Sequence, residues 1–345
     1  MKRLAGVLLA LTLLLIGCTG AQEPETQPEK KQYNATFLTL FDTVTTIVGK
    51  AESEDAFKAA AQSIHDELQK YHQLFDIYND YEGVNNLKTV NDNAGTAPVK
   101  VDRAVIDLLT DCRAYYELTC GMVNPAMGSV LALWHEARDD GINDPVNAYL
   151  PDREKLEEAA AHMDLNAVII DEAASTVYLP DPDMRLDVGA VAKGWSVQRV
   201  RENAPEGLLI SVGGNVCATG AKDDSGTPWV VGIQNPDGGE EYLHTLYVTK
   251  NSVVTSGDYQ RAYVVDGGLY HHIIDPETLY PSTYWRSVTI LCEDSGLADA
   301  LSTALFLLPL EAGQAVLDSV EAEAMWVDRD GNRFYSPGFE ENIRT

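Results

Sequence analysis

Basic residues are scarce in this chain. Of its 345 residues, 25 are Lys or Arg and 53 are Asp or Glu, so the formal net charge is −28. Proteins that hold nucleic acid or anionic lipid by bulk charge carry an excess of basic residues, so the sequence predicts no nucleic-acid binding. A phosphorylated ligand would need a metal cation, a Lys side chain or a helix N-terminus to offset the negative field locally.

Cysteine is also scarce. The five cysteines include no C-x-x-C pair, which argues against a metal cluster. Four of them, Cys112, Cys120, Cys217 and Cys292, fit either disulfides outside the cytoplasm or buried free thiols. The chain has no internal repeat and no internal low-complexity stretch, which argues against a repeat array.

The start of the sequence predicts an export signal. The basic start M-K-R is followed by an apolar run at residues 4–16, which is too short to span a bilayer as a helix. Residues 1–17 are therefore predicted to be a signal peptide.

The end of the apolar run indicates a lipid anchor. L-I-G-C resembles a bacterial lipobox in which Cys18 becomes the lipid-modified first residue; a plain signal peptide cut nearby is the alternative. Residues 18–35 are polar and predict a flexible tether, and residues 36–345 form the predicted folded domain. We therefore expect a protein that is lipid-anchored at the extracytoplasmic face of a bacterial cell membrane.

Apolar periodicity predicts the secondary structure. Helices are predicted at residues 54–71, 102–118, 126–136, 152–162, 190–202 and 297–308, with a loop at 76–93. Strands are predicted at residues 41–48, 167–171, 176–179, 208–212, 230–233, 243–248, 259–265, 270–274 and 288–291. Helices first and antiparallel hairpins later predict an α+β fold, with helices packed on mainly antiparallel sheets.

One carboxylate interrupts the apolar helix predicted at residues 297–308. Asp299 lies on the same helix face as Thr303, one turn later. A buried carboxylate is unfavourable unless it is paired or holds a metal, and these oxygen ligands suit Mg²⁺ better than Zn²⁺. Alternatively, Asp299 caps the N-terminus of its own helix, and Thr303 bonds back to the preceding turn. The residues alone do not separate these hypotheses.

Two glycine-containing stretches join strands to the next element. D-V-G-A-V-A-K-G, at residues 187–194, leads from a strand into a helix through small residues. The N-terminus of this helix and the side chain of Lys193 could hold a phosphate. Alternatively, the small residues only allow the helix to pack closely on the sheet, and Lys193 is an ordinary surface residue. S-V-G-G-N, at residues 211–215, indicates a tight turn, either beside a site or in an ordinary hairpin.

A third pair of stretches flanks one predicted hairpin. T-S-G-D-Y at residues 255–259 precedes it, and H-H-I-I-D-P at 271–276 follows its turn near residue 267. The hairpin would bring Asp258 and His272 together, and a His beside an Asp can act as an acid or base near neutral pH. Alternatively, both are hydrogen-bonded turn residues.

These motifs, with H-I-I-D-P-E-T and A-D-A-L-S-T-A-L-F, occur in the order of the FAD:protein FMN transferases, the ApbE-like flavin transferases. The chain resembles this family over roughly residues 41–308. The resemblance implies an ApbE-like, T-fold-like architecture and Mg²⁺-dependent cleavage of FAD. FMN would be attached through a phosphoester bond to a Thr or Ser of a target protein, with release of AMP. Such targets are typically FMN-binding proteins of extracytoplasmic electron-transfer complexes.

The resemblance also implies roles for single residues. The metal ligands would be the side chains of Asp299 and Thr303 and the backbone carbonyls of Ala190 and Gly296. The residues at FAD-contacting positions are Phe41, Tyr78, Met122, Val123, Asn124, Asp187, Lys193 and His272. Either His272 or Asp258 would take the proton of the target hydroxyl, and the sequence does not choose between them.

The chain departs from the family pattern in two loops. V-N-P-A-M-G at residues 123–128 replaces F-D-x-T-x-G, and T-L-Y-P at 278–281 replaces T-G-x-P. Two other functions fit the same motifs. Water could replace the target hydroxyl, which would give an FAD pyrophosphatase, or the protein could be a lipid-anchored flavin-binding protein without enzymatic activity.

Overall fold

An eight-stranded antiparallel sheet is the largest element of the computed structural model, which describes residues 30–239 and 241–344. Its strands, in spatial order, are β1 (Lys31–Phe37), β2 (Thr45–Ala51), β6 (Leu208–Val212), β7 (Asn215–Ala218), β10 (Ser252–Gly257), β13 (Trp285–Cys292), β14 (Ala322–Asp328) and β15 (Arg333–Tyr335). All neighbours in this order pair antiparallel.

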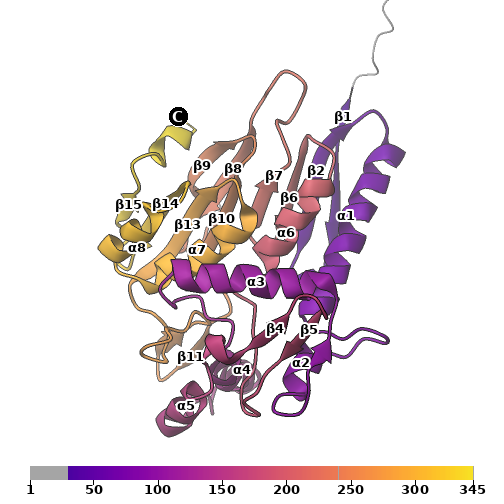
Figure 1. The fold of residues 1–345 in the computed structure, drawn as a ribbon. Coiled ribbons are helices and arrows are strands. Elements are labelled where there is room, and N and C mark those ends of the chain that lie inside the picture. Colours follow the sequence, from indigo (N-terminus) through magenta and orange to yellow (C-terminus); the bar gives the residue numbers. More distant parts are fainter. Residues whose placement is uncertain (1–29, 240, 345) are drawn as a thin grey trace, which may run out of the picture.

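Helices cover one face of this sheet (Figure 1). They are α1 (Glu54–Phe75), α6 (Ala192–Asn203), α7 (Ser295–Leu307) and α8 (Leu310–Leu317), with α3 (Arg103–Leu118) crossing near the ends of α1 and α7. On α1 the buried residues Phe57, Ile64 and Leu68 recur at helical spacing and form its inner stripe. Nearly all of α7 is buried, which explains its apolar sequence.

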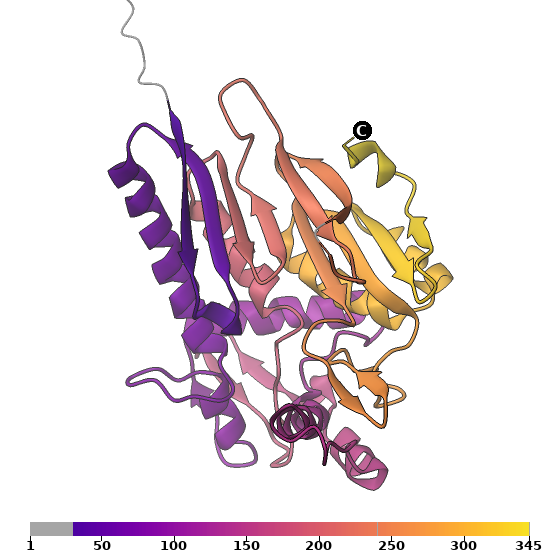
Figure 2. The same ribbon diagram turned by 180° about the vertical axis from the view of Figure 1, so that it is seen from behind.

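A two-stranded ribbon, β8 (Trp229–Gln234) and β9 (Tyr242–Val248), covers the opposite face (Figure 2). Trp229 and Leu246 of the ribbon belong to the same apolar cluster as Leu291 and Val327 of the main sheet. The central strands are therefore covered on both faces, which fixes their position firmly.

A smaller layer lies beyond one end of the main sheet (Figure 1). It contains α2 (Leu87–Asp92), α4 (Gly128–Asn143), α5 (Arg153–Ala160), a three-stranded sheet and a hairpin. The three-stranded sheet has the order β3 (Val99–Lys100), β5 (Thr176–Tyr178), β4 (Ile169–Asp171), and the hairpin joins β11 (Tyr263–Val265) to β12 (Gly268–Tyr270). Three short 3₁₀ turns complete the part of the chain that the structure describes: Leu40–Asp42, Leu165–Ala167 and Glu340–Asn342.

The predicted α+β class is confirmed, but several boundaries differ. The strand predicted at 41–48 begins only at Thr45, because Phe41 and Asp42 have left-handed φ angles of 52° and 53°. The tether predicted to end at residue 35 ends earlier, because Lys31–Phe37 pairs with β2 as an edge strand. The predicted strand 270–274 does not form beyond Tyr270, and the loop predicted at 76–93 contains α2.

The predicted signal peptide, Cys18 and most of the tether lie outside the described residues. Within residues 30–239 and 241–344, no helix is both long and apolar enough to cross a membrane. Cys112, Cys120, Cys217 and Cys292 are free thiols, and all but Cys120 are buried. Of the two alternatives that the sequence left open, free thiols are therefore the one found in the described part of the chain.

Candidate active site at the crossing of α6 and α7

Helices α6 and α7 cross in close contact at Gly194. A Cβ atom there would lie 2.2 Å from the carbonyl oxygen of Ser295 and 2.4 Å from Cβ of Asp299, so only glycine fits. This contact lets Oδ2 of Asp299 accept a 2.8 Å hydrogen bond from the Gly194 N–H. Asp299 therefore caps the neighbouring helix. Its own helix is capped by Asp294, which accepts from the N–H of Leu297, so the predicted self-capping is wrong.

The Asp299 carboxylate is buried among groups that favour its charge. Only 4% of the residue is exposed, and burial raises its pKa. The ammonium of Lys193, whose Nζ lies 3.8 Å from Oδ2, the Gly194 N–H and the side chain of Asn215 act in the opposite direction. A divalent cation would also favour the ionised carboxylate, so this environment suits a metal ligand.

The same contact leaves a backbone carbonyl free. In a continued helix the Gly194 N–H would bond to the carbonyl of Ala190, but here it donates to Asp299. Within the described residues, no backbone N–H donates to Ala190.

The half-buried Thr303 hydroxyl, one turn after Asp299, likewise makes no hydrogen bond within the described chain. The predicted back-bond of Thr303 is not formed; the neighbouring Ser302 bonds back to the Asp299 carbonyl instead, at 2.9 Å.

These donors fit a hard cation. The carboxylate of Asp299, the hydroxyl of Thr303 and the carbonyl of Ala190 are oxygen groups of the kind that Mg²⁺ prefers. Gly296 lies in the first turn of α7, where the carbonyl points along the helix towards the N–H four residues later. Its role as a fourth ligand stays a prediction.

A two-glycine turn brings Asn215 to this site. Gly213 and Gly214 have φ angles of 56° and 94°, which glycine adopts without strain in a tight hairpin, and Val212 pairs with Asn215 across the turn. The side chain of Asn215 is buried, and its Nδ2 has no hydrogen-bond partner within the described residues. The stretch is thus both a hairpin and part of the site. Sequence reasoning singled out its glycines and missed the Asn.

The loop before α6 carries two of the predicted FAD-contacting side chains. Oδ1 of Asp187 accepts a 2.8 Å hydrogen bond from the Gly189 N–H. Nζ of Lys193 lies 3.4 Å from the Gly189 carbonyl, in addition to its contact with Asp299. Lys193 is therefore not an ordinary surface Lys, and it supplies a positive charge to the site of a strongly acidic protein.

His272 is held as a neutral imidazole. Its Nδ1 lies 3.1 Å from the carbonyl oxygen of Gln260, so this nitrogen carries the proton and Nε2 is left as an acceptor. Burial, with the positive charges of Arg261 and Lys193, lowers the pKa of His272 to about 3.

Phe41 and Arg261 lie together at the edge of this site. A guanidinium nitrogen of Arg261 is 3.5 Å from the Phe41 carbonyl, and the Phe41 N–H donates to Nδ1 of His72 at 3.3 Å. Both Phe41 and Arg261 have left-handed backbones, with φ of 52° and 45°. Such strain in residues other than glycine is often found at functional sites. Sequence reasoning missed Arg261.

Asp258 does not pair with His272 as predicted. Its Oδ2 accepts a 3.0 Å hydrogen bond from Nε of Arg286, which also binds Asp237 at 2.7 Å. The hairpin turn lies where the sequence placed it, but residues 259–262 are irregular instead of extended, so the two side chains do not come into register. Asp258 is thus an ion-paired residue behind the site.

Known proteins resemble this chain over most of its length. The sequence profile of the ApbE family matches residues 41–326. This chain belongs to the ApbE family.

Two relatives carry the name FAD:protein FMN transferase. The Treponema pallidum protein is 36% identical over 277 residues, which is 75% of each chain. The Klebsiella pneumoniae protein is 33% identical over 279 residues, 77% of this chain and 84% of its own. The crystal structure of the ApbE protein from Thermotoga maritima superposes with a TM-score of 0.80 at 30% identity, covering 91% of this chain and 100% of that one.

The remaining predicted contacts of this ApbE family member differ in exposure. Tyr78 is 57% exposed and its hydroxyl lies 2.6 Å from Nδ1 of His135, so its ring is available to a planar ligand. Met122 is half-buried, whereas Val123 is part of the core. The amide of Asn124 is used by backbone groups of Met163 and Ala126. Val123 and Asn124 therefore serve packing and the turn, and their side chains do not support the predicted FAD contact.

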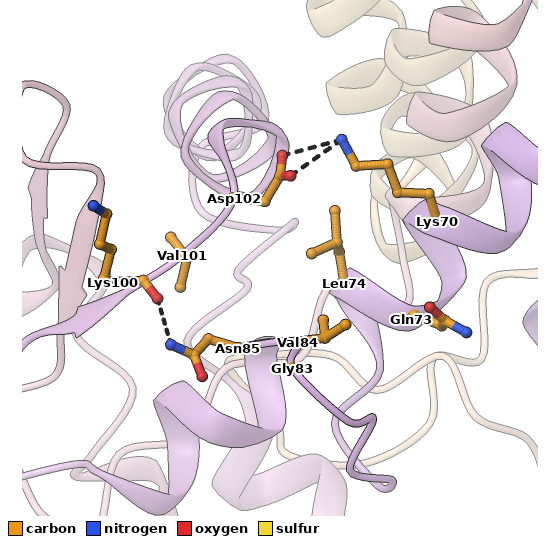
Figure 3. Close-up of a pocket in the computed structure, with 9 residues that line it drawn as sticks. All are labelled: Lys70, Gln73, Leu74, Gly83, Val84, Asn85, Lys100, Val101 and Asp102. Carbon is orange, nitrogen blue, oxygen red and sulfur yellow. Dashed lines mark hydrogen bonds and ion pairs between the residues drawn. The ribbon is translucent and has the colours of Figure 1, made fainter.

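The space at this ApbE site is small. A cavity of about 10 Å³ lies between residues that include His135, Arg261 and His272, far below the several hundred Å³ of a typical ligand pocket. A larger hollow, about 330 Å³, lies elsewhere, between the end of α1, residues 83–85 and the start of α3 (Figure 3).

Proposed function

We propose that this protein is a Mg²⁺-dependent FAD:protein FMN transferase. The observation that carries the proposal is the Gly194–Asp299 contact, which holds a buried carboxylate next to Lys193 and leaves the Ala190 carbonyl without its helical donor. The Thr303 hydroxyl lies one turn further along α7. The family membership and the names of the two relatives support the same activity.

The reaction exchanges a phosphoanhydride bond for a phosphoester bond. The hydroxyl oxygen of the acceptor Thr or Ser bonds to the phosphorus of the FMN half of FAD. The bond from that phosphorus to the bridging oxygen breaks, and AMP leaves. Mg²⁺ would be held by Asp299, Thr303 and the Ala190 carbonyl. The bound cation would neutralise the negative charge of the pyrophosphate. Lys193 adds a fixed positive charge for the same phosphates.

His272 is the better candidate for the base. The Asp258 carboxylate is engaged by Arg286, whereas Nε2 of His272 is an acceptor whose ring is oriented by the Gln260 carbonyl. A pKa of about 3 makes His272 a weak base in the free protein. The negative charge of a bound pyrophosphate would raise that pKa towards neutrality, so the base would be strengthened only when substrate is present.

The activity is tested by incubating the purified protein with FAD, Mg²⁺ and an FMN-binding acceptor protein. We expect the acceptor mass to increase by one FMN less one water, with one AMP released for each acceptor modified, and no reaction in EDTA. Release of free FMN and AMP without a change in acceptor mass would instead identify an FAD pyrophosphatase. Tight FAD binding without turnover would identify a flavin-binding protein.

We also propose that the enzyme is lipid-anchored through Cys18 and acts at the extracytoplasmic face of a bacterial cell membrane, on a protein of an electron-transfer complex. The L-I-G-C pattern supports this setting. Replacing Cys18→Ala should abolish lipid attachment and leave an unprocessed or mislocalised precursor. Continued membrane fractionation, with processing at the same bond, would contradict the anchor.

A further inference from the structure

Two aromatic residues lie beside the small cavity at His272. The Tyr78 hydroxyl is 2.6 Å from Nδ1 of His135, and the Phe41 carbonyl is 3.5 Å from a guanidinium nitrogen of Arg261. His135, Arg261 and His272 all line that cavity. We call Phe41 and Tyr78 the rim residues, because they contact the lining of the cavity from two different segments of the chain.

One buried carboxylate, Asp76, organises the loop that carries Tyr78. Asp76 directly follows α1, and only 9% of the residue is exposed. Its Oδ1 accepts hydrogen bonds from the N–H groups of Tyr78 and Asn79, at 2.7 and 3.1 Å. Its Oδ2 accepts from the side-chain amide of Asn79 at 2.9 Å. These bonds fix the backbone of Tyr78, from which the exposed ring projects.

The same carboxylate is connected to Phe41 through two more side chains. Oδ2 of Asp76 also accepts from the Tyr81 hydroxyl at 2.6 Å, and the oxygen of this hydroxyl lies 3.5 Å from Nε2 of His72. Nδ1 of His72 accepts from the Phe41 N–H at 3.3 Å, and the two rings meet edge to face with centroids 5.5 Å apart. Phe41 has a φ of 52°, a conformation that a residue other than glycine keeps only where its surroundings hold it. Both rim residues are thus tied to Asp76.

The hydrogen bonds from Phe41 to Asp76 run in one direction. The Phe41 N–H can only donate, so Nδ1 of a neutral His72 is the acceptor and its Nε2 carries the proton. Nε2 therefore donates to the Tyr81 oxygen, and the Tyr81 hydroxyl donates to the carboxylate. Burial acts to raise the pKa of Asp76, but the hydrogen bonds that it accepts, that from Tyr81 first, outweigh burial and lower the pKa. An ionised Asp76 is the acceptor that sets this direction.

The loop by itself does not require a charge at Asp76. The C-terminal end of a helix disfavours a negative charge, and a neutral Asn would accept the same two backbone N–H bonds. Asn would, however, present an N–H group to Tyr81. The Tyr81 proton would then turn to His72, whose own proton would move to Nδ1 and oppose the Phe41 N–H. A carboxylate is therefore needed for the connection to Phe41, and not for the loop.

We propose that Asp76 is a positioning residue that holds both rim residues in place before FAD binds. The inference rests on the proposed function, because it assumes that FAD enters at the cavity beside His272. A contact residue that is already ordered loses little freedom when the ligand binds. Its release should therefore weaken affinity by about 3- to 10-fold.

The test is Asp76→Asn, measured by fluorescence titration of the purified protein with FAD. The variant should release Phe41 and leave the Tyr78 N–H bonded, so the FAD dissociation constant should rise by about 3- to 10-fold. In turnover, the KM for FAD should rise similarly while kcat stays unchanged, because binding is lost equally in the ground state and the transition state. An unchanged dissociation constant would overturn the inference.

A double-mutant cycle shows whether Asp76 acts through Phe41. Phe41→Ala should weaken FAD binding by itself, and adding Asp76→Asn should then weaken it little further. Tyr81→Phe keeps the ring and breaks the same connection, so it takes the place of Asp76→Asn in the cycle if that variant does not fold. Effects that add independently would show that the carboxylate acts elsewhere, and would overturn the inference.

Asp328→Asn is the matched control. Oδ1 of Asp328 accepts from the N–H groups of Asp330 and Asn332, at 2.9 and 2.8 Å, and its Oδ2 accepts from the Asn332 amide at 2.8 Å. None of these three residues lines the small cavity. This variant should lower the melting temperature about as much as Asp76→Asn does and leave FAD affinity unchanged. Equal weakening of FAD binding by both variants would make the effect one of general stability and overturn the inference.

Direct titration of FAD separates the two possible failures. A wild type that binds no FAD would refute the proposed function and the inference together. A wild type that binds FAD, with an unchanged affinity in Asp76→Asn, would refute the inference alone.

Discussion

Two polar regions of this protein differ in their hydrogen bonding. The hollow near α1 and α3 is the larger one, and its polar groups bind one another: Nζ of Lys70 lies 3.1 Å from Asp102, and the Asn85 amide donates to the Lys100 carbonyl at 2.8 Å (Figure 3). The α6–α7 crossing is different. There, the buried Asp299 carboxylate of α7 caps α6 by accepting from the Gly194 N–H, and Nδ2 of Asn215 has no hydrogen-bond partner within the described residues.

The difference shows that an open hollow does not by itself mark a binding site. What matters is whether its polar groups are still without partners. A hollow whose charges are paired has little electrostatic free energy to gain from an ion. A crowded crossing with a free carbonyl and an unpaired amide gains bonds when a ligand arrives. In this fold the α6–α7 crossing is therefore the better candidate for catalysis.

Replacing one Asp in each region should give opposite results. Asp299→Asn should reduce FMN transfer by at least about a hundredfold, because a metal site contributes several kcal/mol to phosphoryl transfer. Its metal-free stability should not fall, because a buried charge is removed. Asp102→Ala, which removes the N-cap of α3, should cost about 0.5–2 kcal/mol of stability and leave transfer unchanged. Melting curves with and without Mg²⁺ and FAD, beside transfer rates, check both. Wild-type transfer by Asp299→Asn would show that Asp299 is structural.

Acid should lower the stability of the folded protein through His272, which lies at the candidate active site. The folded pKa lies near 3 and the ordinary value is 6.5, so below pH 6.5 the unfolded state binds a proton that the folded state does not. The contribution of a neutral His272 to stability is complete above pH 6.5 and is lost progressively as the pH falls towards 3. When the pH falls from 7 to 5, the free energy of unfolding of His272→Gln should therefore decrease by about 2 kcal/mol less than that of the wild type. Denaturant unfolding at the two pH values measures this difference, and parallel loss in both proteins would contradict it.

Lysines in the two regions should differ in FAD binding. Lys193→Ala should weaken FAD affinity by about tenfold, the effect of losing about 1.4 kcal/mol of contact with the phosphates, without unfolding the protein. Lys70→Ala removes an equal charge from the large hollow and should leave the affinity unchanged. Fluorescence titration of FAD compares them. Equal affinities for both variants would mean that Lys193 does not contact the phosphates.

Thr303 should give the smallest effect. Thr303→Val keeps the shape and removes a neutral oxygen ligand, so it should weaken Mg²⁺-dependent activity less than Asp299→Asn does. Thr303→Ser restores the hydroxyl and should recover most of the activity. The Mg²⁺ dependence of transfer distinguishes these variants, and identical behaviour of Val and Ser would exclude the hydroxyl as a ligand.

The sequence predicts elements with strong local patterns. The helix at 102–118 and the strand at 208–212 agree with the structure within one residue, because periodic burial sets both. Asp299 stood out because it is a charge in an apolar helix. Asn215 could not be found in the same way, because its burial depends on α6 and α7 packing against β7, which no local pattern reports. The Asp258–His272 pairing was wrong because the distant Arg286 binds Asp258 and the chain bends at Arg261.

The Gly194–Asp299 hydrogen bond also sets the order of events during folding. It joins residues 105 positions apart, so the chain must close a long loop before the bond contributes any stabilisation. Until β13 and α7 have joined the sheet, Asp299 and the Ala190 carbonyl are separate, and Mg²⁺ has no site at which to bind. Folding therefore precedes metal binding, and the cation should slow unfolding of the finished protein without accelerating its folding.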